Sequence, residues 1–306
     1  MSESILLLFL GSSMLYFGSE WIVKGGVAIA EKYRISTLVI GLTVVAFGTS
    51  LPELLVSLNA AFQGSSSIAV GNAIGSNIAN VGLVLSLSAF IFPITLKYQL
   101  IKRDLIVYML SCLVFIIFSF DGRLSKFEGA FFVSSLLFYI VFSIKKPVES
   151  DLEIESTDSD NFTEMILFVI FGIVALALGA DLFVNGAVFI ARFFDVSEVV
   201  IGMSVVAFGT SLPELATSAM AAFKKQSEIS LGNIIGSNIF NIFCVLGITA
   251  IIEPLNSKWN EISFQVVVMI FYGFLIFIAS KLPQPFNRRL SGVMLMGYFL
   301  FIYLLF

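Results

Sequence analysis

The segment Gly41-Leu-Thr-Val-Val-Ala-Phe-Gly-Thr-Ser-Leu-Pro-Glu53 occurs again as Gly202-Met-Ser-Val-Val-Ala-Phe-Gly-Thr-Ser-Leu-Pro-Glu214, with eleven of thirteen residues identical. A second pair, Gly71-Asn-Ala-Ile-Gly-Ser-Asn-Ile-Ala-Asn80 and Gly232-Asn-Ile-Ile-Gly-Ser-Asn-Ile-Phe-Asn241, is identical at eight of ten positions. Both pairs are separated by the same offset of 161 residues. The chain therefore contains an internal repeat, whose two copies align without a gap across this region.

The composition places both copies in a membrane. Hydrophobic residues make up 58% of the 306 residues and Asp, Glu, Lys and Arg only 12%, whereas roughly 25% charged residues is usual in soluble domains. A span needs roughly 20 apolar residues, and the mean hydropathy is +1.01. Apolar runs lie at about 5–28, 37–62, 68–92, 103–120, 127–144, 164–191, 199–222, 229–252, 262–280 and 290–306. The sequence predicts an all-α membrane protein with ten transmembrane helices.

An acidic, hydrophilic linker at 145–162 separates five runs from five. We expect a first five-helix repeat over 1–144, with its repeated motifs at about 37–92, and a second over 163–306, with its repeated motifs at about 199–252. Because five is odd, the second copy must cross the membrane upside down relative to the first. Such inverted-topology repeats are typical of secondary transporters, whose site lies at the midplane between the copies.

The orientation follows from the basic residues. If the N-terminus is external, the cytoplasmic loops hold twelve Lys and Arg residues and the outer loops only four. Basic residues favour the cytoplasmic side. The sequence therefore predicts a multi-pass protein of the cell membrane with both termini external and the linker cytoplasmic.

Glu53 and Glu214 are the residues best suited to carry the chemistry. Each lies near the middle of an apolar run, where an ionisable group costs roughly 2.5–3.5 kcal/mol to insert. No Lys or Arg occupies the same depth in the neighbouring runs of the repeat. If inversion symmetry brings the carboxylates together, a cation or protons must balance their charges. A protonated structural glutamate is the plainer alternative, which here would have to occur twice.

Each glutamate follows a sequence that breaks the helix. Pro52 has no N–H and leaves the carbonyl of Gly48 without its helical partner. Broken backbone at membrane depth is tolerated where it is buried in protein or lines a cavity. Thr49 and Ser50 precede Glu53 by four and three residues, which predicts that the three side chains share one helix face. The same arrangement recurs at Thr210, Ser211 and Glu214.

The second repeated motif adds neutral oxygen atoms. Ser76 and Asn80 are spaced four apart, as are Ser237 and Asn241, so each pair offers a hydroxyl and an amide oxygen on one face. Hydrogen bonding between helices is their alternative role. With two carboxylates and no histidine, the set suits hard cations, foremost Ca²⁺ and Na⁺. Two Glu charges balance one Ca²⁺ or two Na⁺, so alternative occupancy of one site is a physical basis for exchange.

These motifs resemble the α-repeats of the cation/calcium exchanger superfamily, and in particular its prokaryotic sodium/calcium exchangers. The resemblance covers nearly the whole chain. It implies an antiporter, not an enzyme, that exchanges Na⁺ for Ca²⁺ by alternating access, with the first and sixth spans sliding across the other eight. It also implies that Glu53 and Glu214 are the central carboxylates. Further oxygen ligands would come from Thr49, Ser50, Ser76, Thr210, Ser211 and Ser237, and from the backbone of Ala46 and Ala207.

The sequence departs from some branches of this superfamily. Archaeal relatives and the potassium-dependent branch often carry Asp where this chain has Asn241, and the missing carboxylate predicts a K⁺-independent exchanger. The acid follows Leu-Pro, whereas the proton/calcium branch carries it in a Gly-Asn-x-x-Glu setting, which favours Na⁺ as the driving ion. H⁺/Ca²⁺ antiport is the alternative within this class. An ion channel and an intramembrane hydrolase that activates water with two carboxylates are alternatives from other classes.

The remaining expectations concern partners. We expect Ca²⁺ extrusion with net charge movement, no cofactor, and Ca²⁺ and Na⁺ as the substrates. Membrane lipid is the expected surrounding, with no nucleic acid and no obligate protein partner. Glu20 and Asp181 form a third acidic pair at the same offset, for which capping or helix–helix hydrogen bonding is expected in preference to a role in the site.

Overall fold

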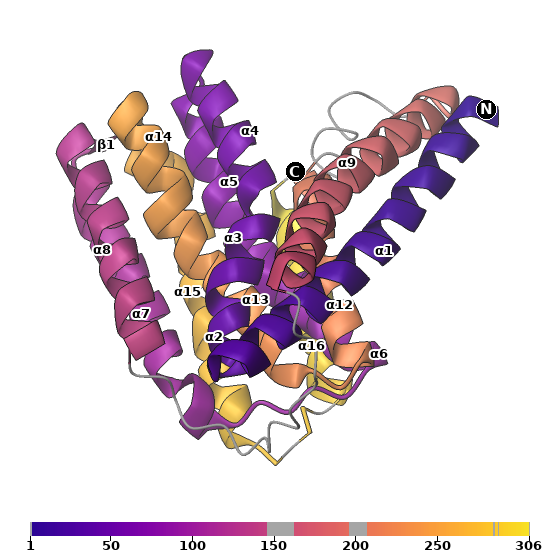
Figure 1. Ribbon diagram of the computed structural model, residues 1–306. Helices are drawn as coiled ribbons and strands as arrows, with labels where there is room; N and C mark the ends of the chain where they lie inside the picture. The colour runs from indigo at the N-terminus through magenta and orange to yellow at the C-terminus, as the bar shows by residue number, and fades with distance from the viewer. Residues whose placement is uncertain (1, 146–161, 196–206, 284, 287, 306) are drawn as a thin grey trace.

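Helices dominate the computed structural model (Figure 1), which describes residues 2–145, 162–195, 207–283, 285–286 and 288–305. The first half contains α1 (Ser2–Tyr33), α2 (Thr37–Ile40), η1 (Gly41–Val45), α3 (Ala46–Thr49), α4 (Leu51–Phe62), α5 (Ser66–Ala79), η2 (Asn80–Leu85), α6 (Ser86–Ile91), α7 (Tyr98–Phe118), β1 (Arg123–Leu124) and α8 (Lys126–Lys145). The second half contains α9 (Phe162–Phe193), α11 (Ala207–Thr210), α12 (Leu212–Phe223), α13 (Ser227–Phe240), η4 (Asn241–Leu246), α14 (Gly247–Ile252), β2 (Leu255–Asn256), α15 (Trp259–Lys281) and α16 (Arg288–Leu304).

The repeated sequence folds into repeated local structure. Elements α4, α5, η2 and α6 have the same lengths as α12, α13, η4 and α14, and each pair is separated by the offset of the sequence motifs. The η2 and η4 segments are π-helical turns that begin at Asn80 and Asn241. Such turns are uncommon and frequently lie at functional sites. The predicted acidic linker falls almost wholly outside the described residues, as does the start of the predicted span at 199–222.

Six helices of the described chain are long and apolar enough to cross a membrane. A seventh span results if Thr37–Thr49 and Leu51–Phe62, which are bent relative to each other, are counted as one. Three of the other predicted spans fall short of this length and apolar character, each for a specific reason. Helix α7 carries Lys102, Arg103 and Asp104 in its first turns, α16 has only 17 residues, and the segment before α11 is not described. Ten spans therefore stay a prediction.

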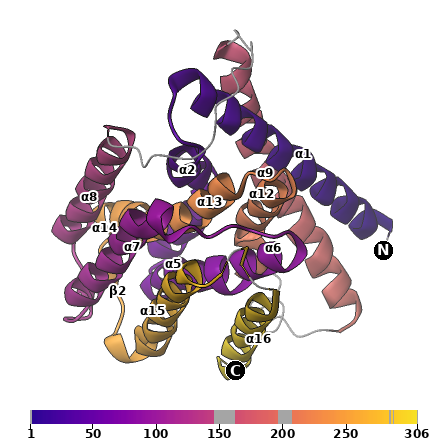
Figure 2. The same ribbon diagram turned by 90° about the horizontal axis from the view of Figure 1, so that it is seen from below.

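The repeat helices form the centre of the molecule. Seen from below, α5 and α13 are surrounded by α7 with α8, by α15 with α16, and by α1 with α9 (Figure 2). Most residues of the continuous helices Ser66–Ile91 and Ser227–Ile252 are buried. On α13, small residues permit this packing: a Cβ added to Gly232 would lie 2.5 Å from the Leu38 carbonyl oxygen. The two repeats thus meet along their most polar motifs.

Helices α1 and α9 pack against each other as an antiparallel pair on one flank (Figures 1 and 2). A Cβ added to Gly18 would lie 3.0 Å from the carbonyl oxygen of Gly172, and one added to Gly172 would lie 2.9 Å from that of Gly18. The backbones therefore touch, as small-residue helix interfaces in membranes allow. The glycines recur every seven residues, at Gly11, Gly18 and Gly25 on α1 and at Gly172, Gly179 and Gly186 on α9.

A short antiparallel strand pair ties the turn after α7 to the turn after α14. Strands β1 and β2 align Arg123 with Asn256 and Leu124 with Leu255. The all-helical prediction did not include these strands. They connect the two halves at one end of the molecule, where β2 also contacts α5.

Candidate functional site

Glu53 and Glu214 lie in the first turns of α4 and α12, directly after a break in the helix. At the first break α3 ends at Thr49, α4 begins at Leu51, and the two segments are bent by 42°. This break occurs where Pro52 removes a helical hydrogen bond. The second half breaks at the equivalent residue, Ser211. Glu53 is 1% exposed and Glu214 is fully buried.

The two carboxylates interact electrostatically across the interface between the halves. Among the described residues, neither of them forms an ion pair with Lys or Arg. Two negative charges at this depth repel each other and lose their hydration. The arrangement is therefore stable only when cations or protons neutralise it.

Hydroxyl groups of both halves surround Glu214 of the second half. Ser50 Oγ donates to Glu214 Oε1 at 3.3 Å, and the hydroxyls of Thr49 and Ser237 also lie beside this carboxylate. The helical-face prediction instead paired Thr49 and Ser50 with Glu53. That prediction included the kink at Pro52 but not the packing of the two halves, which brings the Ser50 hydroxyl to Glu214 at the point where the chain changes direction.

Glu53 has the reciprocal surroundings. The hydroxyl of Thr210 from the second half lies beside its carboxylate, together with that of Ser76 from its own half. Each carboxylate thus lies beside a serine hydroxyl from the following helix of its own half. It also lies beside hydroxyl groups from the segment that precedes the glutamate of the other half. Neither half contains a complete set, so the site requires both.

Two asparagines that the sequence did not single out brace the glutamates. Asn72 Nδ2 donates to the backbone carbonyl of Glu53 at 3.0 Å and to Ser57 Oγ at 3.0 Å. Asn233 Nδ2 donates to the carbonyl of Glu214 at 3.4 Å, and its Oδ1 accepts from Thr49 Oγ1 at 3.0 Å. Each follows the first glycine of its copy of the Gly-Asn motif. The presence of asparagine at this position in both copies was the sequence signal that could have identified them.

Asn80 and Asn241 lie where the α-helices pass into the π-helical turns. Asn80 is 1% exposed and Asn241 is fully buried. Asn80 Nδ2 donates to Asn238 Oδ1 at 3.1 Å, and Asn241 Nδ2 donates to Asn77 Oδ1 at 3.1 Å. The predicted alternative, hydrogen bonding between helices, therefore accounts for the amide nitrogens. It leaves the amide oxygens available.

The predicted backbone ligands, the carbonyl oxygens of Ala46 and Ala207, differ from the side chains in how freely they could bind a cation. The carbonyl oxygen of Ala46 already accepts from the Ser50 N–H at 3.0 Å and from Thr49 Oγ1 at 3.4 Å. A carbonyl has two lone pairs, and the one proton of the Thr49 hydroxyl has a shorter acceptor in Asn233 Oδ1 at 3.0 Å, so Ala46 retains a lone pair that could face a cation. Ala207 is the first residue of α11.

Several buried oxygen atoms of the site have no hydrogen-bond partner among the described residues. Leaving one such group unsatisfied costs roughly 1–3 kcal/mol, and native proteins leave few. Oxygens gathered beside two carboxylates are the ligands that Ca²⁺ and Na⁺ prefer. These atoms are Glu53 Oε2, Glu214 Oε2, Ser211 Oγ, Asn80 Oδ1 and Asn241 Oδ1.

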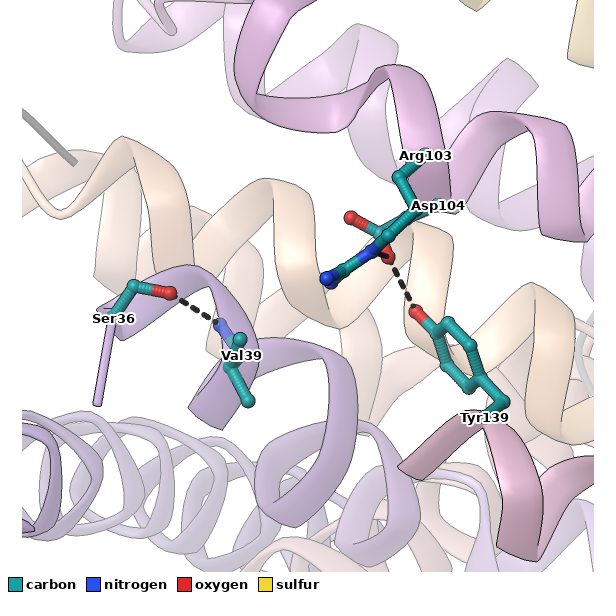
Figure 3. A network of polar contacts seen from close by, with 5 residues as sticks. All are labelled: Ser36, Val39, Arg103, Asp104 and Tyr139. Atoms are coloured by element: carbon teal, nitrogen blue, oxygen red, sulfur yellow. Dashed lines mark hydrogen bonds and ion pairs between the residues drawn. The ribbon is translucent and has the colours of Figure 1, made fainter. Parts of the chain in front are cut away.

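Asp104 shows how a buried acid is neutralised by the protein itself (Figure 3). Its Oδ1 accepts from Arg103 Nε at 3.0 Å and from the Tyr139 hydroxyl at 3.0 Å. Asp104 is fully buried and bridges α7 to α8. With a protein counter-ion in place it has no need of a cation, in contrast to Glu53 and Glu214.

Glu20 and Asp181 lie apart from the two buried glutamates. Glu20 Oε1 accepts from Lys224 Nζ at 2.7 Å, which joins α1 to the end of α12. Asp181 Oδ2 accepts from Asn185 Nδ2, one turn further along α9, at 3.1 Å. The Glu20 contact joins two helices, as expected, whereas the Asp181 contact lies within α9.

Comparison with known proteins identifies the family. The sequence model described as "Sodium/calcium exchanger protein" matches residues 3–145 and 164–306. The chain belongs to the sodium/calcium exchanger family. A sodium/calcium exchanger of Methanosarcina acetivorans is 33% identical, over 99% of this chain and 98% of the relative. An inner membrane protein of Escherichia coli is 33% identical, over 96% and 94%.

Solved exchanger structures have the same fold. The structure of the sodium–calcium exchanger NCX_Mj soaked with Na⁺ and Ca²⁺ superposes with a TM-score of 0.85 at 35% identity, covering 98% of this exchanger and 97% of that chain. The prediction of a prokaryotic member of the cation/calcium exchanger superfamily is confirmed. This family consists of membrane transporters, and cation/Ca²⁺ exchange is its activity.

Proposed function

We propose that this exchanger couples Na⁺ entry to Ca²⁺ extrusion across the cell membrane, with one shared site that is exposed alternately to the two sides. The observation that carries the proposal is a pair of buried carboxylates without a protein cation among the described residues, surrounded by unpaired oxygens. Two carboxylates balance one Ca²⁺ or two Na⁺, and hydroxyl and amide oxygens complete the coordination. Binding of one ion species therefore excludes the other.

The proposed ligands are the groups that the sequence singled out. Glu53 and Glu214 supply the charge. A cluster of three or more acids, His or Cys, such as a transition-metal site would require, does not occur in the described residues. The neutral oxygens are assigned to Thr49, Ser50, Ser76, Asn80, Thr210, Ser211, Ser237 and Asn241, with the backbone of Ala46 and Ala207 in a supporting role.

The same proposal includes ten spans in two inverted five-helix repeats, divided by the linker at 145–162. The bias of Lys and Arg toward one set of loops supports external termini and a cytoplasmic linker. Helices α1 and α9 contact each other at successive glycines, so we assign them to a unit that moves against the remaining helices during alternating access.

Na⁺ is the proposed driving ion, without a requirement for K⁺. Asn241 supplies an oxygen but no charge, so the site holds two negative charges and needs no additional K⁺ to balance a third. Entry of a further Na⁺ onto the neutral oxygens would move a net charge in each cycle. Proton-driven exchange is the competing function, since protons could also neutralise the glutamates.

Flux into proteoliposomes tests these points together. Vesicles loaded with Na⁺ are diluted into Na⁺-free medium containing labelled Ca²⁺, with K⁺, with a protonophore, and with a clamped membrane potential. We expect Ca²⁺ uptake that requires internal Na⁺, continues without K⁺, survives the protonophore and responds to the potential. Uptake that needs no Na⁺ and is stopped by the protonophore would instead establish H⁺/Ca²⁺ antiport.

A further inference from the structure

Four buried asparagines meet where the two repeats cross. Asn77 and Asn80 come from the end of α5 and the start of η2, and Asn238 and Asn241 come from the equivalent positions of α13 and η4. All four are at most 1% exposed. Only Asn80 and Asn241 have been assigned to the ion site, so the other two require a separate account.

The hydrogen bonds of Asn77 determine which atom Asn241 leaves free. Asn77 Nδ2 donates to the backbone carbonyl of Asn238 at 3.2 Å. Because a carbonyl can only accept, this bond fixes the amide of Asn77 with its Oδ1 on the other side. That oxygen can only accept, so Asn241 must offer it Nδ2, and does so at 3.1 Å. The amide oxygen of Asn241 is then the atom without a partner among the described residues.

The second arm repeats the arrangement. Asn80 Nδ2 donates to Asn238 Oδ1 at 3.1 Å, and Asn80 Oδ1 is left without a partner in the described part of the chain. Asn238 Nδ2 likewise has no hydrogen-bond partner there, so this arm is fixed less firmly than the arm at Asn77.

We propose that Asn77 and Asn238 are positioning residues that hold the amides of Asn80 and Asn241 with their oxygens toward the transported cation. The inference rests on the proposed function. An amide that could turn over would present its N–H₂ group to the cation as readily as its oxygen, and a donor repels a cation. We call the four residues Asn77, Asn80, Asn238 and Asn241 the amide clasp.

The clasp also makes the residues at positions 77 and 241 depend on each other. An aspartate at position 241 would place a carboxylate oxygen against Asn77 Oδ1, which is an acceptor facing an acceptor. With an apolar residue at position 77 the aspartate meets no such conflict, and either of its oxygens can face the cation. A carboxylate at 241 is therefore compatible with leucine at 77 and incompatible with asparagine.

A double-mutant cycle tests this dependence through Ca²⁺ binding to the purified full chain, measured by calorimetry. The variants are Asn77→Leu, Asn241→Asp and the two combined. We expect Asn77→Leu to weaken Ca²⁺ binding by about tenfold, the size of effect that loss of a group orienting a metal ligand produces. The factor by which Asn241→Asp raises the Ca²⁺ affinity should be at least about tenfold larger in the Asn77→Leu background than in the wild-type background.

The combined variant is its own control for packing. It keeps the leucine at position 77, so any damage to the fold caused by leucine is still present and cannot explain restored binding. Asn59→Leu, an exposed position on α4, should leave the Ca²⁺ affinity unchanged. If Asn77→Leu does not yield folded protein, the same cycle is measured with Asn238→Leu and Asn80→Asp, where a smaller coupling of the same sign is expected.

The outcomes separate the clasp from the proposed function. If the wild-type protein binds Ca²⁺ and the effects of the two single substitutions on Ca²⁺ affinity add to within about twofold in the combined variant, the clasp is overturned. The proposed exchanger site is then left intact. Ca²⁺ binding with the expected coupling, but Ca²⁺ flux that ignores Na⁺, would support the clasp and reject sodium-driven exchange. A wild-type protein that does not bind Ca²⁺ would overturn both.

Discussion

At the scale of single residues, the proposed function depends on two carboxylates that the described part of the protein leaves without a counter-ion. Asp104 is equally buried, but Arg103 and Tyr139 bind it. Glu53 and Glu214 have hydroxyl groups for neighbours in place of a basic side chain; one oxygen of each, like Oδ2 of Asp104, has no hydrogen-bond partner among the described residues. Burial of a charge is tolerated only with a compensating charge, so the transported ion itself becomes part of the stable structure.

Replacement of either glutamate by glutamine is expected to abolish Ca²⁺ transport. The neutral side chain keeps the size and hydrogen bonding of the original but removes one of two charges that balance Ca²⁺. Loss of one partner of a buried charge pair costs at least about 2 kcal/mol, or roughly 30-fold in affinity. Ca²⁺ uptake by Glu53→Gln and Glu214→Gln proteoliposomes measures this, with the exposed residue change Glu3→Gln as the control. Wild-type uptake in either glutamine variant would refute the site.

At the scale of elements, the breaks in the helices position the site residues, and close contacts between helices join α1 to α9. The bend at Ser50 turns the hydroxyls of one half toward the glutamate of the other, and the π-helical turns begin at the asparagines of the clasp. Regular helix would have paired each glutamate with its own hydroxyls. The glycines of α1 and α9 bring two long helices into backbone contact instead.

The close contact between α1 and α9 predicts that alanine destabilises the protein at a glycine of this contact but not at a glycine outside it. A Cβ at Gly172 would lie 2.8 Å from the backbone nitrogen of Ile22, so Gly172→Ala must separate α1 from α9. We expect a loss of about 1–3 kcal/mol, as for overpacked cores. At Gly292 the nearest atom would be 3.8 Å away, and alanine there should be neutral or stabilising because it restricts the unfolded chain. Thermal unfolding in detergent compares the two, and equal midpoints would contradict the contact.

At the scale of the whole molecule, two halves of one chain share one site. Ser50 and Thr49 reach Glu214, Thr210 reaches Glu53, and the clasp joins both repeats at their crossing. Neither repeat by itself would hold a complete set of oxygens. An odd number of spans in each half would place the copies in opposite orientations, which would make the proposed site accessible from either side by equivalent movements.

Cysteine labelling tests the proposed orientation. The native Cys112 and Cys244 are buried and should not react, so Gln63→Cys and Lys225→Cys each add one exposed thiol. The turn between α4 and α5 is expected outside and the turn between α12 and α13 inside. A membrane-impermeant maleimide added to intact cells should therefore label the variant at 63 alone. Labelling at 225 alone would reverse the topology.

The sequence by itself determined the membrane class, the repeat and the residues that carry charge. Low charge content is a property of composition, and an identical motif at a fixed offset can be read without coordinates. Glu53 and Glu214 stood out because an acid within an apolar run is costly wherever the run packs. The Gly-Asn motif was equally visible, although Asn72, Asn77, Asn233 and Asn238 received no role from it.

Only the tertiary structure decided which half contacts which glutamate and which amide atoms of Asn80 and Asn241 are left without a hydrogen-bond partner in the described part of the chain. Sequence spacing reports which residues share a face of one helix, and the kink at Pro52 could be read from it, but only the packing of the two halves brings Thr49 and Ser50 beside Glu214. The orientation of Asn241 depends on Asn77, which lies 164 positions away in the chain and is itself held by the carbonyl of Asn238. Contacts between segments so distant in the chain arise from packing, which local sequence patterns do not encode.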